Sequence, residues 1–116
     1  MFKPLELGSY FDTNESDLVA LYGAIQDLHL VEFVYSDFQR FAEPYELGKT
    51  VLGDILLRGY QIGGEAFGPL VVGWKLFRLD YISSVGISKE PFSPRADYWS
   101  LPPFWTYDPI IVLKGV

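Results

Sequence analysis

The sequence predicts a mainly β protein of one domain, residues 1–116, in which one N-terminal helix precedes a small five-stranded barrel and an extended C-terminal tail. Three observations predict this fold class. Apolar residues recur every three or four positions before residue 30 and every second position after it. Several short β-branched and aromatic runs are separated by Gly, Pro and Asp. The chain is 49% hydrophobic and 17% aromatic, which is enough to fill one core.

The helix is expected over about residues 14–29. Thr13 or Asn14 can cap its first turn, and the acidic Glu15 and Asp17 lie near the positive end of the helix dipole. Its apolar stripe, spaced at three and four residues, consists of Leu18, Leu21, Tyr22, Ile25 and Leu28.

The barrel is expected over about residues 30–90, and its five strands are short. The first begins near Leu30, and the others are QRFAEPYEL (39–47), DILLRGYQIG (54–63), GWKLFRLD (73–80) and YISSVGIS (81–88). Pro44 has no N–H to donate, which predicts an edge strand or a bulge. The tail, about residues 91–116, is rich in proline and aromatic residues and is expected to wrap the surface, and its end, PIIVLKGV, is compatible with one more strand.

Composition excludes several classes of site. With 15 acidic and 9 basic residues the net charge is −6, so any contact with nucleic acid needs a local basic patch. The absence of Cys and the single His argue against disulfides and metal sites, and we expect no cofactor. No secretory or membrane-spanning apolar run is present, so we expect a cytoplasmic protein.

An ordered set of short motifs extends from the helix to Tyr98. The motifs are Ala24-Ile25, VEFVY (31–35), Arg40 before EPY (43–45), LLRGYQ (56–61), GWKLFRLDYI (73–82) and PFSPRADY (91–98). In this order they resemble the WYL domain, a small Sm-like or SH3-like β-barrel of bacterial and phage-associated regulators. The sequence departs from the family where Ile55, Leu56 and Leu57 replace the namesake Trp-Tyr-Leu, and where Tyr81 replaces a basic residue.

The resemblance implies a regulatory domain that senses or binds a ligand, often nucleic acid or a nucleotide-like molecule. In larger family members an attached helix-turn-helix binds DNA. Here the expected helix has no second helix at turn distance, so we do not expect this chain alone to act as a transcription factor.

The candidate ligand-binding residues are Tyr35, Arg40, Arg58, Tyr60, Trp74 and Arg78. The arginines lie in three different expected strands beside apolar runs, where a guanidinium needs a planar anionic partner. That partner is either a ligand or an internal carboxylate, for which Glu32, Glu43 and Asp80 are available. The aromatic residues either stack on a ligand or pack in the core. Arg58 and Tyr60 are two apart and so share a strand face, and Trp74 and Arg78 share one by the same count.

The expected function is therefore non-catalytic binding of an anionic ligand, either a nucleotide or a short single-stranded nucleic acid. The stretch GGEAFG (63–68) lacks the Gly-Lys-Ser or Gly-Lys-Thr of a phosphate loop, and no catalytic constellation is evident. The alternative is a protein-protein or self-assembly module, in which the arginines pair internally and the aromatic string at 98–107 docks on a partner or a second copy. We expect that string to clasp the domain itself, because its exposure would promote aggregation.

Overall fold

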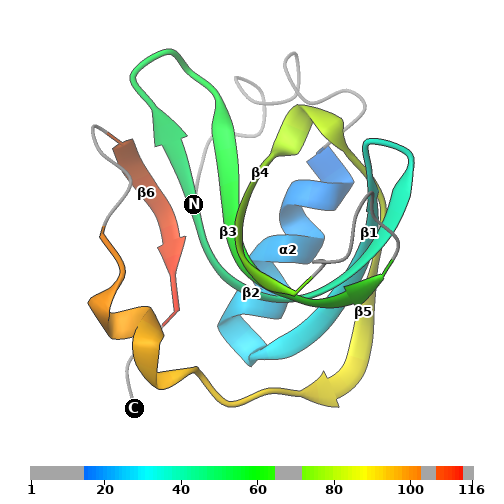
Figure 1. Ribbon diagram of the computed structural model, residues 1–116. Coiled ribbons are helices and arrows are strands. Elements are labelled where there is room, and N and C mark those ends of the chain that lie inside the picture. The colour runs from blue at the N-terminus through cyan, green and yellow to red at the C-terminus, as the bar shows by residue number, and fades with distance from the viewer. Residues whose placement is uncertain (1–14, 65–71, 103–106, 114–116) are drawn as a thin grey trace.

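The part of the chain that the structure describes is mainly β, with one α-helix before the strands, as the sequence predicts. A computed structural model describes residues 15–64, 72–102 and 107–113 (Figure 1). The elements are α2 (Glu15–Asp27), β1 (His29–Tyr35), β2 (Phe38–Thr50), β3 (Ile55–Gly64), β4 (Gly73–Arg78), the 3-10 helix η1 (Leu79–Tyr81), β5 (Ile82–Pro91), the 3-10 helix η2 (Ala96–Ser100) and β6 (Tyr107–Val112). Within these ranges, no helix has the length and apolar character that crossing a membrane requires.

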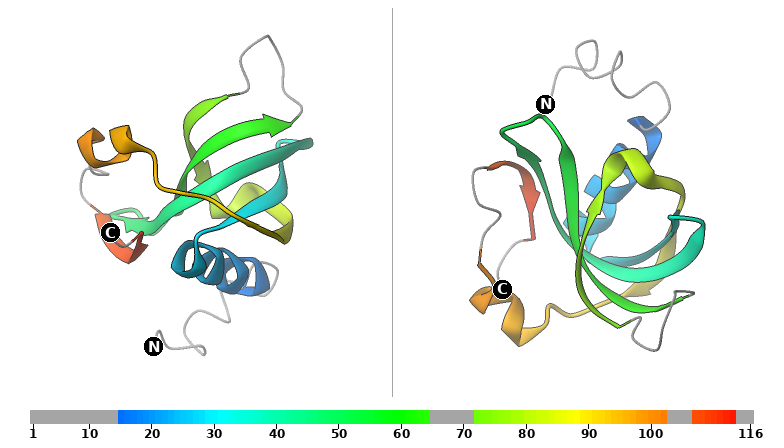
Figure 2. Two further views of the ribbon diagram at one scale, coloured as in Figure 1. Left: turned by 90° about the horizontal axis from the view of Figure 1, so that it is seen from below. Right: turned by 45° about the horizontal axis from the view of Figure 1, so that its top comes forward.

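The strands form one antiparallel sheet of six strands in the order β4-β3-β2-β1-β5, and β6 pairs with β2. The sixth strand comes from the tail, which also contains η2, so the tail has more regular structure than an extended wrap. Both tail elements lie on the side of the molecule away from β1 and β5 (Figures 1 and 2).

Strand β2 organises the sheet, because it pairs with β3 on one side and with both β1 and β6 on the other. Its residues 38–42 pair with β1, and its residues 46–50 pair with β6. Pro44 lies between these two stretches, and the register with β3 shifts between Pro44 and Glu46. The expectation of an edge or a bulge at Pro44 is confirmed as an irregularity: Pro44 pairs with Gly59 of β3, and on its other side the pairing with β1 has ended and the pairing with β6 has not begun.

The core lies between α2 and the curved sheet. The helix buries the apolar face that its spacing predicts, with Leu18, Leu21, Ala24 and Ile25 almost fully covered. Opposite them, the rings of Phe33 and Phe77 meet edge to face at 5.0 Å. We call the sheet face that bears the buried Val31, Phe33, Ala42, Leu57 and Phe77 the core face.

Candidate functional site

The strand register divides the six candidate residues between the two faces of the sheet. Tyr60 on β3 lies opposite Trp74 on β4, and Leu56 lies opposite Arg78 in the same unbroken ladder. Side chains alternate along a strand, so Arg58, Tyr60, Trp74 and Arg78 all project from the face opposite Leu57. We call this side of β2, β3 and β4 the tail face, because residues 92–101, the tail segment, lie against it.

Arg58 on the tail face is buried and paired with a carboxylate. Its Nη1 lies 3.5 Å from Oε1 of Glu46, and the two side chains are only 11% and 5% exposed. The two residues are cross-strand neighbours in the β2–β3 ladder, which explains the pairing. The charge of Arg58 is therefore balanced inside the protein.

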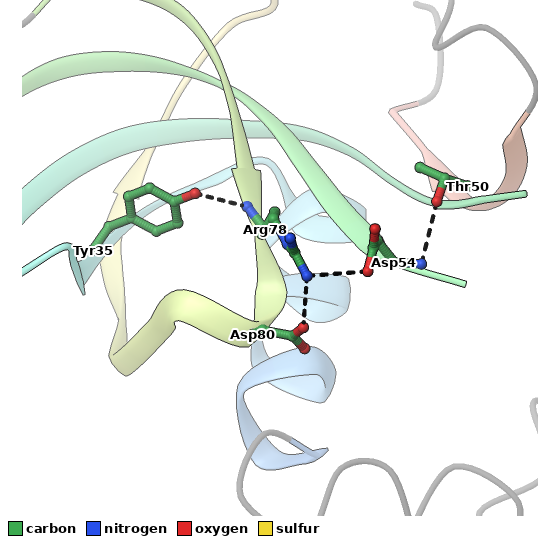
Figure 3. A network of polar contacts seen from close by, with 5 residues as sticks. All are labelled: Tyr35, Thr50, Asp54, Arg78 and Asp80. Atoms are coloured by element: carbon green, nitrogen blue, oxygen red, sulfur yellow. Dashed lines mark hydrogen bonds and ion pairs between the residues drawn. The ribbon is translucent and has the colours of Figure 1, made fainter. Parts of the chain in front are cut away.

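Arg78 stands at the end of β4 in a network of polar contacts (Figure 3). Its Nη2 donates to Oδ1 of Asp54 at 3.1 Å and to Oδ2 of Asp80 at 3.2 Å, so of the two alternatives left open by the sequence, Arg78 has the internal carboxylate partner. The hydrogen bond to Asp80, followed by the charge of Asp54, raises the pKa of Arg78. The Tyr35 hydroxyl accepts the backbone N–H of Arg78 at 3.1 Å. Two carboxylates thus already surround this guanidinium.

Tyr60 and Trp74 are covered by the tail segment. The Trp74 indole Nε1 donates to Oδ2 of Asp97 at 3.0 Å, and the Arg95 guanidinium carbon lies 3.7 Å from the centroid of the Tyr60 ring. Tyr98 is buried, whereas its neighbour Trp99 is 52% exposed. The chain therefore clasps its own body at Tyr98, and the part of the aromatic string at residues 103–106, with the Tyr107 side chain, lies outside the described residues.

Arg40 and Tyr35 belong to the core face, at the end of β1 and the beginning of β2. Arg40 lies opposite the buried Phe33. Its Nη1 donates to Oε1 of Gln61 at 3.2 Å, and its Nη2 donates to the carbonyl oxygen of Tyr35 at 3.1 Å. Its Nε is buried and has no hydrogen-bond partner within the described residues.

The environment of Arg40 differs from that of every other arginine in the chain. Arg58, Arg78 and Arg95 each lie within ion-pair distance of a carboxylate. In the described part of the chain, Arg40 forms no ion pair; its guanidinium forms hydrogen bonds with an amide and a carbonyl and lies 5.5 Å from the centroid of the Tyr35 ring. Lys75 projects from the same core face, because it lies opposite Gly59, two residues from both Leu57 and Gln61.

The structure therefore does not bring the three candidate arginines to one surface. It places Arg58 and Arg78 beside acids on the tail face and Arg40 on the core face. It adds Arg95, which lies within the motif PFSPRADY but is not among the six candidate residues. The signal that could have found Arg95 is the need of the buried Glu43 for a cationic partner. Among residues 15–64, 72–102 and 107–113, no group of acidic and His side chains is arranged to hold a metal ion.

Comparisons with known proteins give a likeness of fold. No protein-family model matches the chain, and a search of curated proteins found no match. Among solved structures, the chain is similar to a part of Proteasome accessory factor B/C (PafBC) of Arthrobacter aurescens, with 22% sequence identity and a TM-score of 0.60. The match covers 72% of this chain but spans only 13% of the length of the PafBC chain. At this identity the likeness concerns the fold alone.

Proposed function

We propose that this chain is a WYL-like regulatory module that binds an anionic ligand without catalysing a reaction, and that Arg40 on the core face holds the anion. The ligand class is a nucleotide or a short single-stranded nucleic acid. The motif order from the helix to Tyr98 supports this proposal. So does the similarity of fold to part of a protein named as an accessory factor, although that similarity does not identify a ligand.

One observation carries the choice of Arg40. Its guanidinium is held by a neutral amide and a neutral carbonyl, and among the described residues no carboxylate forms an ion pair with it, whereas Arg58, Arg78 and Arg95 each have one. Its Nε, like that of Arg78, is buried without a hydrogen-bond partner in the described part of the chain. Buried donors in proteins are nearly always paired, and a guanidinium pairs best with a planar anion. Phosphate or carboxylate oxygens would complete its hydrogen bonding.

Two further residues of the core face support this choice. Lys75 adds a second cation on the core face, and none of its contacts is with an acid within the described residues. Gln61 is fully buried and its amide Nε2 donates to the carbonyl of Gly63 at 3.1 Å, so its Oε1 is held facing Arg40. In this proposal Gln61 fixes the direction of the Arg40 guanidinium, and Lys75 adds charge.

Thermal-shift measurements test the proposal with mono-, di- and cyclic nucleotides and short oligonucleotides. The variants are Arg40→Gln and, as the matched control, Arg78→Gln, because Arg78 is already surrounded by Asp54 and Asp80. We expect a ligand that raises the Tm of the wild type and of Arg78→Gln, and Tm shifts at several ligand concentrations that give Arg40→Gln at least a tenfold higher Kd, which corresponds to about 1.4 kcal/mol. The proposal fails if none of these compounds raises the Tm, or if Arg40→Gln responds as the wild type does.

A further inference from the structure

The tail face carries a second set of polar anchors, which lies on the opposite side of the sheet from Arg40. Along the tail segment, Arg95, Asp97 and Tyr98 each form a hydrogen bond with a side chain of the sheet. The sheet supplies the partners from β2 and β4, so they are held by the ladder whether or not the segment is bound.

The first anchor is a guanidinium site built around Glu43, which is only 7% exposed. Arg95 Nε donates to Oε1 at 2.9 Å and Nη2 donates to Oε2 at 3.1 Å, which is the bidentate geometry that selects arginine over lysine. The hydrogen bond with Glu43 also raises the pKa of Arg95. The Tyr60 ring forms the wall beneath the guanidinium, at 3.7 Å.

Tyr45 orients this site from within the sheet. Its hydroxyl donates to Oε1 of Glu43 at 2.9 Å and accepts the backbone N–H of Arg95 at 2.9 Å. The Tyr45 hydroxyl thus orients the Glu43 carboxylate and also binds the backbone of the tail segment at Arg95. The ring of Tyr45 is fully buried, so this arrangement is part of the rigid body of the domain.

The second anchor is a tyrosine site that ends at Glu46. The Tyr98 hydroxyl donates to Oε2 of Glu46, and the Tyr98 ring packs 4.7 Å from the ring of Tyr45. Arg58 holds the other carboxylate oxygen of Glu46 from the β3 side. Between the two anchors, Trp74 donates its indole N–H to Asp97. Side chains of the sheet therefore form hydrogen bonds with three residues of the tail segment, Arg95, Asp97 and Tyr98.

The link between β5 and η2 has a structure that would allow the tail segment to be exchanged between two molecules. Residues 92–95 join β5 to η2 without helix or strand structure, and they include Pro94. The only strand with which β6 pairs, within the described residues, is β2. Every anchor described above thus joins a residue that precedes Pro91 in the sequence to a residue that follows it. Such contacts are satisfied equally well when the later part comes from another molecule.

We propose that the tail face is a recognition site for the peptide pattern Arg-x-Asp-Tyr, which residues 95–98 of the chain fill in cis, and which the same segment of a second copy fills in trans. The proposal goes beyond the function above, because it uses the opposite sheet face and a peptide ligand that contains both a cation and an anion. It also explains why two buried carboxylates, Glu43 and Glu46, stand on one face. Glu43 receives its cation from the segment, in addition to the hydrogen bond from Tyr45, and Glu46 receives the Tyr98 hydroxyl, in addition to its ion pair with Arg58.

Mixing two complementary full-length variants tests exchange directly. The first, Glu43→Gln, has a weakened face and an intact segment. The second, Arg95→Ala with Tyr98→Phe, has an intact face and a weakened segment. We expect each variant alone to be monomeric by light scattering and the mixture to contain a heterodimer. A mixture of the second variant with a chain carrying all three substitutions is the matched control and should stay monomeric.

A peptide assay gives an independent reading. A labelled peptide of residues 92–102 should bind the Arg95→Ala, Tyr98→Phe chain at least tenfold more tightly than it binds the wild type, whose face is filled in cis. A peptide with Ala and Phe at the same two positions should bind neither chain. If circular dichroism shows that the double variant is unfolded, the Arg95→Lys chain replaces it in both assays. Absence of the heterodimer together with absence of selective peptide binding overturns the proposal.

Discussion

Arg95 and Glu43 are 52 residues apart in the chain and form a bidentate ion pair that joins the tail segment to β2. The Glu43 side chain is 9% exposed and the Arg95 side chain 39% exposed, so the pair lies at the edge of the buried region. Its two members therefore contribute unequally to stability, because removal of the cation leaves the more buried carboxylate without compensation.

A double-mutant cycle with Arg95→Ala and Glu43→Gln measures this pair. We expect Arg95→Ala to lower the free energy of unfolding by about 2 kcal/mol, and Glu43→Gln to lower it less, because the amide keeps an acceptor for Tyr45. The coupling energy should be about 1 kcal/mol, reduced by the exposure of Arg95. Urea unfolding of the four chains gives these values. Additive effects would show that the pair adds no stability of its own.

Tyr45→Phe tests the alkaline stability of the tail face. Burial, the largest cause, raises the pKa of Tyr45 above its ordinary value, and the negative charge of Glu43 adds to the effect. The folded state therefore retains a proton that the unfolded state loses near pH 10. The contribution of Tyr45 to stability is complete below pH 10 and is lost as the pH rises further, with a slope of at most about 1.4 kcal/mol per pH unit.

The measurement is urea unfolding of both chains between pH 8 and pH 11. Below pH 10 Tyr45→Phe should be the less stable chain, because it lacks the hydroxyl that bonds Glu43 and Arg95. Above pH 10 the difference between the two chains should shrink. A difference that stays constant over the whole range would mean that Tyr45 ionises in the folded state as readily as in the unfolded one.

The elements could be predicted from the sequence because their signals are local. The strand expected from Leu30 begins at His29, and the boundary expected between the strands 73–80 and 81–88 falls in the 3-10 helix Leu79–Tyr81. The pairing of Arg78 with Asp80 can also be predicted from the sequence, since the two residues are two positions apart.

The arrangement of the candidate site depends on information that is not local. Arg58 pairs with Glu46, which was not among the expected carboxylates, because only the β2–β3 register brings the two together. Arg40 was grouped with Arg58 and Arg78, yet it lies on the other sheet face. The irregularity at Pro44 places Tyr45 and Glu46 against the same tail residue, Tyr98, which simple alternation along a strand does not predict.

Asp37→Gly should stabilise the hairpin between β1 and β2. Ser36 and Asp37 form its two-residue turn, and both have positive φ, 52° and 67°. This backbone conformation is typical of a type I′ turn, in which Gly is preferred at the second position. We expect the free energy of unfolding to rise by about 0.5 to 1 kcal/mol. Asp37→Ala is the control, since it removes the same charge but keeps the strain, and it should bring no gain in Tm.

Gly64→Ala should strongly destabilise the protein, whereas Gly63→Ala should have little effect. Gly64 has φ +117°, and a Cβ there would lie 2.3 Å from the carbonyl oxygen of Gln39 and 3.0 Å from Cα of Arg40. Both contacts are with backbone, so no side-chain rotation relieves them. A Cβ at Gly63 meets nothing within 4 Å. We expect a loss of about 2 kcal/mol or more for Gly64→Ala and less than about 0.5 kcal/mol for Gly63→Ala.

Thermal unfolding of Gly64→Ala and Gly63→Ala measures this difference. The two variants are matched, because each adds one methyl group and the two positions are adjacent. Because Gly64 pairs with Arg40, the displaced backbone would also turn the guanidinium away from Gln61. Gly64→Ala should therefore weaken binding of an anionic ligand even at temperatures where the chain remains folded, and Gly63→Ala should not. Equal Tm values for the two variants would contradict the close approach of β3 to Gln39, and with it the packing that positions Arg40.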